Sequence, residues 1–145
     1  MFELGTDGPS TIVVGVDGST TSMRAGAYAA GLARRQRSRL VVVHVLAIGG
    51  LASLIPSGMA AVRQASQEIA EELRRQVAEA AEARGVPVTF VAVQGDPYLE
   101  LVRIADQMRA DVVVVGASTK RTHRLAGSLA IRLVRAGRWP VTVVP

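Results

Sequence analysis

Short apolar runs alternate with longer amphipathic or alanine-rich segments along the whole chain. The apolar runs are rich in valine and isoleucine, which favours β-strands. Strands are therefore predicted at 11–17, 39–46, 86–93, 110–116 and 139–144. The run at 39–46 has almost no polar alternation, which is typical of a strand covered on both faces of its sheet.

Four segments between these runs have the composition or the periodicity of helices. They are predicted at 19–37, 58–84, 97–108 and 128–137. Asp96 followed by Pro97 indicates the N-cap and first position of the third helix. Gly85 ends the second helix and Pro87 prevents its resumption. The apolar stripe expected to pack that second helix against the core consists of Val62, Ile69, Leu73 and Val77.

This β-α-β-α-β-α-β-α-β order predicts an α/β fold: a Rossmann-like, open five-stranded parallel sheet with helices on both faces. We expect the strand order 3-2-1-4-5, with residues 1–10 as an N-terminal extension and 11–145 as one domain. Ligands of such sheets bind beyond the carboxyl ends of the strands, where the winding direction reverses. The sequence therefore places a pocket between Asp17 and Gly116.

Composition narrows the classes of function. The 145 residues include no cysteine and two histidines, so a disulfide framework and a thiolate metal site are excluded and no metal site is expected. The net charge is +5, and sixteen of the seventeen basic residues are arginine. With only five aromatic residues for base stacking, we expect no nucleic-acid partner. Binding of a polyanion by the arginines at 34, 35, 37 and 39 and the basic C-terminal residues is the least favoured alternative.

The sequence also bears on location. Residues 1–10 lack the basic start and apolar run of a signal peptide. The longest apolar segment, 40–55, is interrupted by His44 and two glycines and is shorter than the roughly 20 residues that a membrane helix needs. We therefore expect a soluble, cytoplasmic protein without a membrane partner.

Four stretches, in the same order, resemble the universal stress protein family. They are VVGVDGSTTSMRA, LVVVHV, GDPYLELVRIADQMRADVVVVGAS and GSLAIRLVRAGRWPVTVVP, and the resemblance extends over essentially the whole chain, from residue 11 to 144. The resemblance implies a stress-response role and, commonly, a homodimer paired through the last strand. In this chain that strand contributes Val141, Thr142, Val143 and Val144.

Many members of this family bind ATP, and these carry the motif G-x2-G-x9-G-(S/T) after the fourth strand. Gly116 matches the first glycine, and Gly127 with Ser128 matches the final pair. Thr119 stands where the second glycine belongs, and seven residues instead of nine separate it from Gly127. A β-branched residue in a left-handed conformation costs about 1–2 kcal/mol, so the shortened loop must follow another path.

The resemblance implies a site for ATP or a related adenine nucleotide. Asp17 would face the ribose and adenine, and the backbone of Val45 would hold the adenine edge. The full set of residues placed at this site is Gly15, Val16, Asp17, Val45, Gly116, Ala117, Ser118, Thr119, Lys120, Gly127, Ser128 and Leu129.

Several of these residues have a second interpretation. The loop after Gly116 supplies hydroxyls and cations beside a helix N-terminus, which favours anions, but it also fits a solvated basic loop in which Ser128 only caps its helix. Asp17 fits a ligand contact and a cap for the first helix, and the two roles are compatible. His44 lies in a strand expected to be buried and is interpreted as a hydrogen-bonded structural residue.

No catalytic residues are predicted. The chain lacks a P-loop, and Lys120 replaces the last glycine of a nucleophile elbow. We therefore expect no enzyme, or at most a slow ATPase. Two functions stay open: a stress-response binding protein with an adenine nucleotide between strands 1 and 4, or a family member without nucleotide that acts as a dimeric protein-interaction scaffold. An apolar edge strand favours pairing in both cases.

Overall fold

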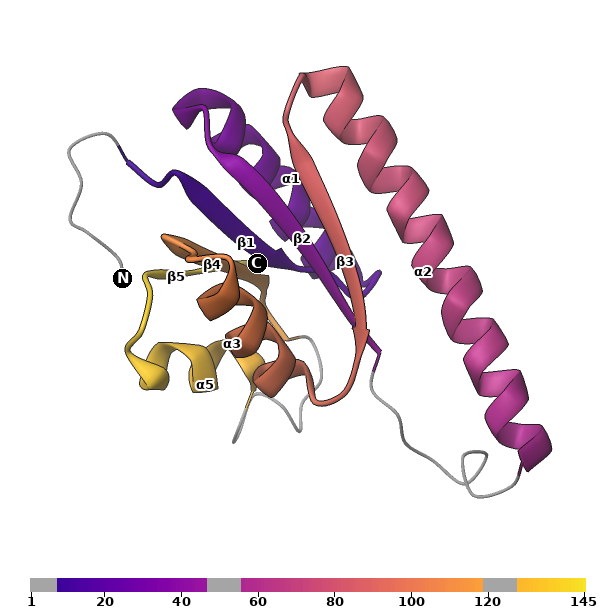
Figure 1. Ribbon diagram of the computed structural model, residues 1–145. Helices are drawn as coiled ribbons and strands as arrows, with labels where there is room; N and C mark the ends of the chain where they lie inside the picture. The colour runs from indigo at the N-terminus through magenta and orange to yellow at the C-terminus, as the bar shows by residue number, and fades with distance from the viewer. Residues whose placement is uncertain (1–7, 47–55, 119–127) are drawn as a thin grey trace.

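The computed structural model describes residues 8–46, 56–118 and 128–145 (Figure 1). Its strands are β1 (Thr11–Gly15), β2 (Arg39–Leu46), β3 (Val88–Gln94), β4 (Val112–Gly116) and β5 (Val141–Val144). Its helices are α1 (Thr20–Gln36), α2 (Pro56–Arg84), α3 (Pro97–Gln107) and α5 (Leu129–Ala136). The strands form one sheet in the order β3-β2-β1-β4-β5, and every neighbouring pair is parallel. The predicted α/β fold is confirmed.

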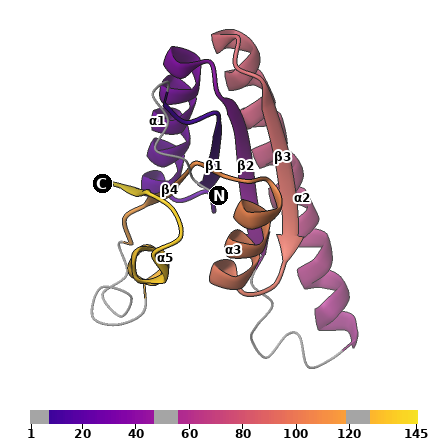
Figure 2. The ribbon, with the colours of Figure 1, turned by 60° about the vertical axis from the view of Figure 1, so that its left-hand side comes forward.

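Helices cover both faces of this sheet, as the apolar runs predict. Successive side chains of a strand point to opposite faces. In β1, Ile12 and Val14 therefore join the core beneath α1, whereas Val13 joins the core beneath α3 and α5. Figure 2 shows α1 and α2 on one side of the sheet and α3 with α5 on the other.

Helix α1 approaches the sheet closely because its inner face is made of alanine. Ala25, Ala29 and Ala33 recur every fourth residue and are at most 1% exposed. At its start, Ser19 is the N-cap, and its hydroxyl accepts a hydrogen bond from the backbone N–H of Ser22. This close packing decides which residues are tolerated at the end of β4, as described below.

Helix α2 is the longest element, and its N-terminal half projects past the sheet (Figure 1). Leu73 is buried and Val62 and Val77 are half-buried, but Ile69 is 51% exposed, so the predicted packing stripe is wrong at Ile69. The helical period of the stripe is real, but the sheet ends before the stripe does. Within the described ranges, no helix is long and apolar enough to cross a membrane.

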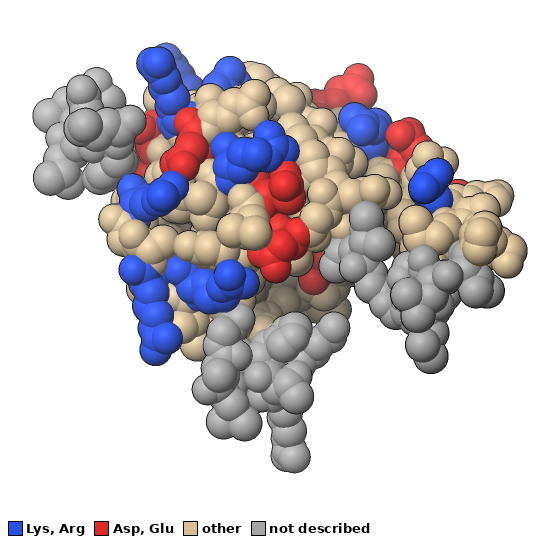
Figure 3. All heavy atoms as spheres, turned by 60° about the horizontal axis from the view of Figure 1, so that its bottom comes forward, with Lys and Arg blue, Asp and Glu red and all other residues tan. Residues whose placement is uncertain are grey.

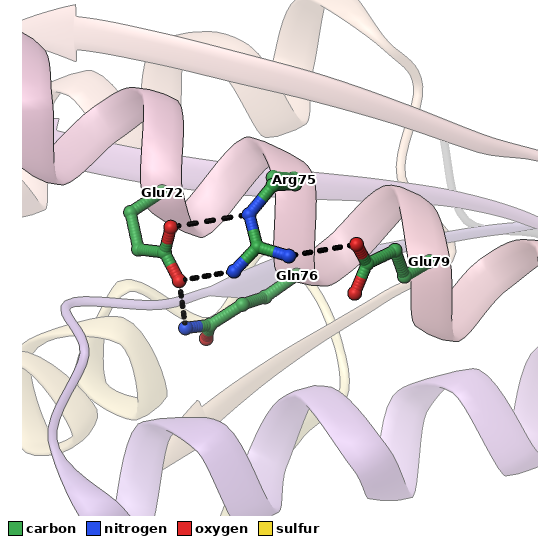
Figure 4. A network of polar contacts seen from close by, with 4 residues as sticks. All are labelled: Glu72, Arg75, Gln76 and Glu79. Carbon is green, nitrogen blue, oxygen red and sulfur yellow. Dashed lines mark hydrogen bonds and ion pairs between the residues drawn. The ribbon is translucent and has the colours of Figure 1, made fainter.

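The outward face of α2 carries charged pairs. Arg75 contacts Glu72 at 2.6 Å and Glu79 at 2.7 Å, and Gln76 also donates to Glu72 (Figure 4). The hydrogen bonds from Arg75 and Gln76 lower the pKa of the Glu72 carboxyl. Because these side chains are exposed and lie three or four residues apart, the pairs support the helix itself rather than the core.

Two strands begin later than predicted, because the residues before them still donate backbone hydrogen bonds to the preceding helix. Strand β3 begins at Val88 instead of 86, because the N–H of Val86 still donates to Ala81 of α2 after the left-handed Gly85. Strand β4 begins at Val112 instead of 110, because Ala110 donates to Ala105 of α3 in the same way. Of the predicted N-terminal extension, only residues 8–10 belong to the described part of the chain.

Candidate functional site

A pocket of about 250 Å³ opens at the carboxyl ends of β1 and β4, where the strand order reverses. Eight of the residues predicted for the site line it: Gly15, Val16, Asp17, Val45, Gly116, Ala117, Ser118 and Leu129. Ser128 lines a groove next to it. Thr119, Lys120 and Gly127 lie outside the described residues.

Half of the residues that line the pocket are not among those predicted from the sequence. The additional lining residues come from the first turns of three helices and from the strands beneath them: Ser19, Thr21, Ser22, Val43, Pro97, Leu101, Val115 and Ala130. Most of them lie at or just after the carboxyl end of a strand, whereas Val43 lies within β2 and Leu101 in the second turn of α3.

The floor of the pocket is apolar. Val43 and Val45 of β2 and Val115 of β4 line it, and Leu101 of α3, which is 1% exposed, packs beneath the opening. A Cβ on Gly15 would meet the Leu101 side chain at 3.6 Å, which is an ordinary contact. The floor therefore offers flat hydrocarbon surface and no charged group among these residues.

Asp17 places a carboxylate on the pocket wall. Its Oδ1 accepts a hydrogen bond of 2.8 Å from the N–H of Ser19, and its own N–H donates to the Ser22 hydroxyl at 3.1 Å. Partial burial raises the pKa of Asp17, but the hydrogen bonds from Ser19 and Ser22 outweigh it and hold the pKa below its ordinary value. Asp17 is therefore ionised at neutral pH. Ser19, not Asp17, is the N-cap of α1.

His44 fixes the backbone that leads to Asp17. It is buried, and its Nδ1 donates a 2.9 Å hydrogen bond to the carbonyl of Val16, which confirms the predicted structural role. The N–H of Val16 in turn donates to the carbonyl of Val43 at 2.8 Å. Val16 is thus held from both sides at the pocket.

Gly116 is required by packing. A Cβ at this position would lie 2.5 Å from the carbonyl carbon of Thr21 and 2.7 Å from the nitrogen of Ser22, both backbone atoms of α1. The Thr21 hydroxyl also donates a 2.8 Å hydrogen bond to the carbonyl of Ala117. The glycine that matches the first position of the nucleotide motif therefore has a structural reason that is independent of any ligand.

Three helices begin at this pocket, with Ser19, Asp96 and Ser128 as their N-caps. The Asp96 cap confirms the prediction, and Ser128 accepts from the N–H of Ile131 at 3.2 Å. The first turn of a helix presents N–H groups and the positive end of its dipole. Because the first turns of α1, α3 and α5 all contribute to the wall, this edge of the sheet favours an anion.

Arginines of the C-terminal region are partly neutralised by acids of α3. Arg132 lies 4.1 Å from the centre of the Tyr98 ring and 3.9 Å from Asp96, and Arg138 contacts Asp106 at 2.6 Å. On the face that Figure 3 shows, basic and acidic side chains are mixed. Among the described residues, no cluster of three or more histidine, aspartate or glutamate side chains is arranged to hold a metal ion.

A second hollow, which we call the edge groove, adjoins the pocket. It has a volume of about 510 Å³ and shares Ala117, Ser118 and Ala130 with the pocket. From there it passes Ser128 and reaches Val143 on β5. Its remaining lining residues are Ile131, Val134 and Arg135.

Comparison with known proteins gives consistent matches over nearly the whole chain. A model of the Universal stress protein family matches residues 9–145. Universal stress protein MJ0531 of Methanocaldococcus jannaschii is 28% identical over 136 residues, which cover 92% of this chain and 80% of that protein. The crystal structure of a protein from the universal stress protein family of Burkholderia pseudomallei is 28% identical, with a TM-score of 0.73, and covers 97% of this chain and 98% of that one. A universal stress protein crystallised in complex with cAMP is 27% identical, with a TM-score of 0.71 and coverage of 94% and 96%.

Proposed function

Because this chain belongs to the universal stress protein family, we propose that it is a stress-response binding protein that takes an adenine nucleotide, such as ATP or AMP, between β1 and β4. The observation that carries the proposal is one pocket with an apolar floor, an ionised Asp17 and the first turns of three helices in its wall. The relative crystallised with cAMP supports the same class of ligand.

Each part of a nucleotide has a matching surface. The faces of an adenine ring are apolar and suit the floor of Val43, Val45 and Leu101. The carboxylate of Asp17 accepts hydrogen bonds, which ribose hydroxyls donate. The phosphates would lie toward Ser118 and the N-terminus of α5. Since the pocket volume of about 250 Å³ is below the roughly 300 Å³ of pockets for drug-sized ligands, we expect the phosphates at the mouth.

Calorimetric titration of the purified protein with ATP, AMP and cAMP tests this function, and micromolar-range affinity is expected. The variant Asp17→Asn keeps an oxygen for the Ser19 N–H but loses the charge, so AMP should bind about 10-fold more weakly, as for a lost hydrogen bond to a charged group. Asp106→Asn is the matched control, because Asp106 pairs with Arg138 and does not line the pocket. No heat with any of the three nucleotides would refute the proposal.

We expect binding without rapid turnover. Among the described residues that line the pocket, Asp17 is the one carboxylate and no histidine is present. The carboxylate already accepts a hydrogen bond from the N–H of Ser19 and lies at the ribose end of the proposed pose. At most a slow ATPase activity is therefore expected.

We also propose a homodimer paired through β5. Within the described part of the chain, β5 pairs on one side only, with β4. Val143 is 42% exposed at this edge. An open, apolar edge strand invites pairing with another chain, and antiparallel pairing with a second copy would cover it.

Replacing Val143 with lysine is expected to convert the dimer into monomers, because the new charge would have to be buried against a second copy. Light scattering coupled to size-exclusion chromatography measures the mass. Leu99→Lys is the control, since Leu99 is 60% exposed on α3, away from β5. Equal masses for the two variants would contradict pairing through β5.

Two observations favour the alternative function, a dimeric scaffold without nucleotide. The packing of α1 explains Gly116 without a ligand, and the loop that follows has Thr119 in place of the second motif glycine and is two residues short. Mass spectrometry of small molecules that copurify with the native protein separates the two functions. An adenine nucleotide at stoichiometric amounts supports the binding protein, and an empty protein that also gives no calorimetric signal supports the scaffold.

A further inference from the structure

Ala117 joins the pocket to the edge of the sheet. Its N–H donates a 2.7 Å hydrogen bond to the carbonyl of Val144 at the end of β5, and its carbonyl accepts the Thr21 hydroxyl of α1. Ala117 also lines both the pocket and the edge groove. Ala117 therefore links the end of β5 to the pocket wall through two hydrogen bonds.

The edge groove continues the pocket toward the surface that a second copy would cover. Pocket and groove share Ala117, Ser118 and Ala130, so the two hollows adjoin each other. The groove ends at Val143, and its outer wall includes the 57%-exposed Val134. A second copy paired on β5 would lie over this apolar wall, directly beside the phosphate end of the proposed nucleotide.

The charge of the edge groove decides whether a bound anion would strengthen or weaken pairing through β5. Arg135 is exposed and is the charged residue among the described lining of the edge groove. It forms no ion pair within the described part of the chain, and from Gly116 to Pro145 the sequence has no acidic residue. A twofold pair uses the same patch of both copies, so it would bring two positive Arg135 side chains to one interface, which disfavours pairing.

From these observations we infer that nucleotide binding and pairing through β5 are coupled, and that the phosphates strengthen the dimer. Phosphates at the shared residue Ser118 would lie between pocket and groove, where their negative charge offsets the repulsion between arginines. Coupling is reciprocal, so the dimer must bind the nucleotide more tightly than the monomer by the same factor. This inference rests on the nucleotide site and the dimer proposed above.

Sedimentation of the full chain over a concentration series, with and without ligand, measures the coupling. Saturating ATP is expected to lower the dimer Kd about 5-fold or more, which is the lower end of typical coupling between sites. AMP, with less charge, should have a smaller effect, and adenosine should have none. In the reciprocal titration, ATP should bind correspondingly more weakly when the protein is diluted below its dimer Kd.

Two variants test the role of the charge. Arg135→Gln should form a tighter dimer without ligand and should lose the response to ATP. Arg34→Gln is the matched control, because Arg34 is an exposed arginine in the last turn of α1 that lines neither hollow. It should behave as the unchanged protein.

The outcomes separate this inference from the function it rests on. If ATP binds and dimers form, but the dimer Kd is the same with and without ATP, the coupling is refuted and the nucleotide site stands. If adenosine strengthens the dimer as much as ATP, the electrostatic mechanism is refuted. If ATP gives no calorimetric signal, both the coupling and the proposed nucleotide site are refuted. If no dimer forms, both the coupling and the proposed β5 interface are refuted.

Discussion

Replacing Leu101 with alanine is expected to lower the free energy of unfolding by about 2–5 kcal/mol, the usual range for a leucine truncated in a core. Leu101 is 1% exposed and belongs to the core between the sheet and the helices α3 and α5. It also lies under the pocket, beside Gly15. The truncation therefore removes buried hydrocarbon and leaves a cavity at the same place. Urea denaturation followed by circular dichroism measures the loss.

Leu99→Ala is the matched control on the same helix. Leu99 is 60% exposed, so its truncation should change the free energy of unfolding by less than about 0.5 kcal/mol. Its backbone N–H, which donates to Asp96 at the helix start, is kept by alanine. Equal losses for the two variants would show that α3 does not pack as described.

Replacing Gly116 with alanine should cost about 1–3 kcal/mol, the typical range for an overpacked position. The added methyl group would lie 2.5 Å from a backbone carbon of α1, and backbone cannot rotate away as a side chain can. Either α1 or the end of β4 must move, and Ala117 with its two hydrogen bonds must move with it. Thermal or urea unfolding gives the size of the effect.

Two other glycines provide controls for this prediction. A Cβ on Gly31, inside α1, meets nothing within 4 Å, so Gly31→Ala should stabilise the helix by about 0.5–1 kcal/mol. Gly15→Ala should fold normally, because its nearest neighbour is a leucine methyl at 3.6 Å. If Gly116→Ala unfolds at the same denaturant concentration as the unchanged protein, the close approach of α1 to β4 is wrong.

The sequence predicts the sheet well because its signals are local. Each strand is a short apolar run, and Asp96 with Pro97, and Gly85 with Pro87, mark helix ends that the structure confirms. The strand order then places the pocket between β1 and β4. The half-buried stripe of α2 is the exception. Its period is that of a helix, but period alone does not reveal how far the sheet extends beneath it.

The pocket wall is less predictable because it depends on neighbours in space. Thr21 and Pro97 lie in the first turns of helices that follow different strands, and only the parallel arrangement brings these turns to one opening. Gly116 shows the converse difficulty. A motif alignment assigns it to a phosphate, whereas its distance to the backbone of α1 shows that packing alone already requires glycine there. A residue type can thus match a motif for a reason unrelated to the ligand.

The order of strands in the sheet also has a consequence for how the chain folds during its synthesis. β1, β2 and β3 are consecutive in sequence, whereas β4 joins β1 only after most of the polypeptide has been synthesised. The hydrogen bond from Thr21 to Ala117 closes a separation of 96 residues, and it lies at the junction of these two parts. An N-terminal fragment therefore has no complete pocket. A ligand bound in this pocket would contact both parts of the chain and would therefore stabilise the complete fold relative to partly folded states.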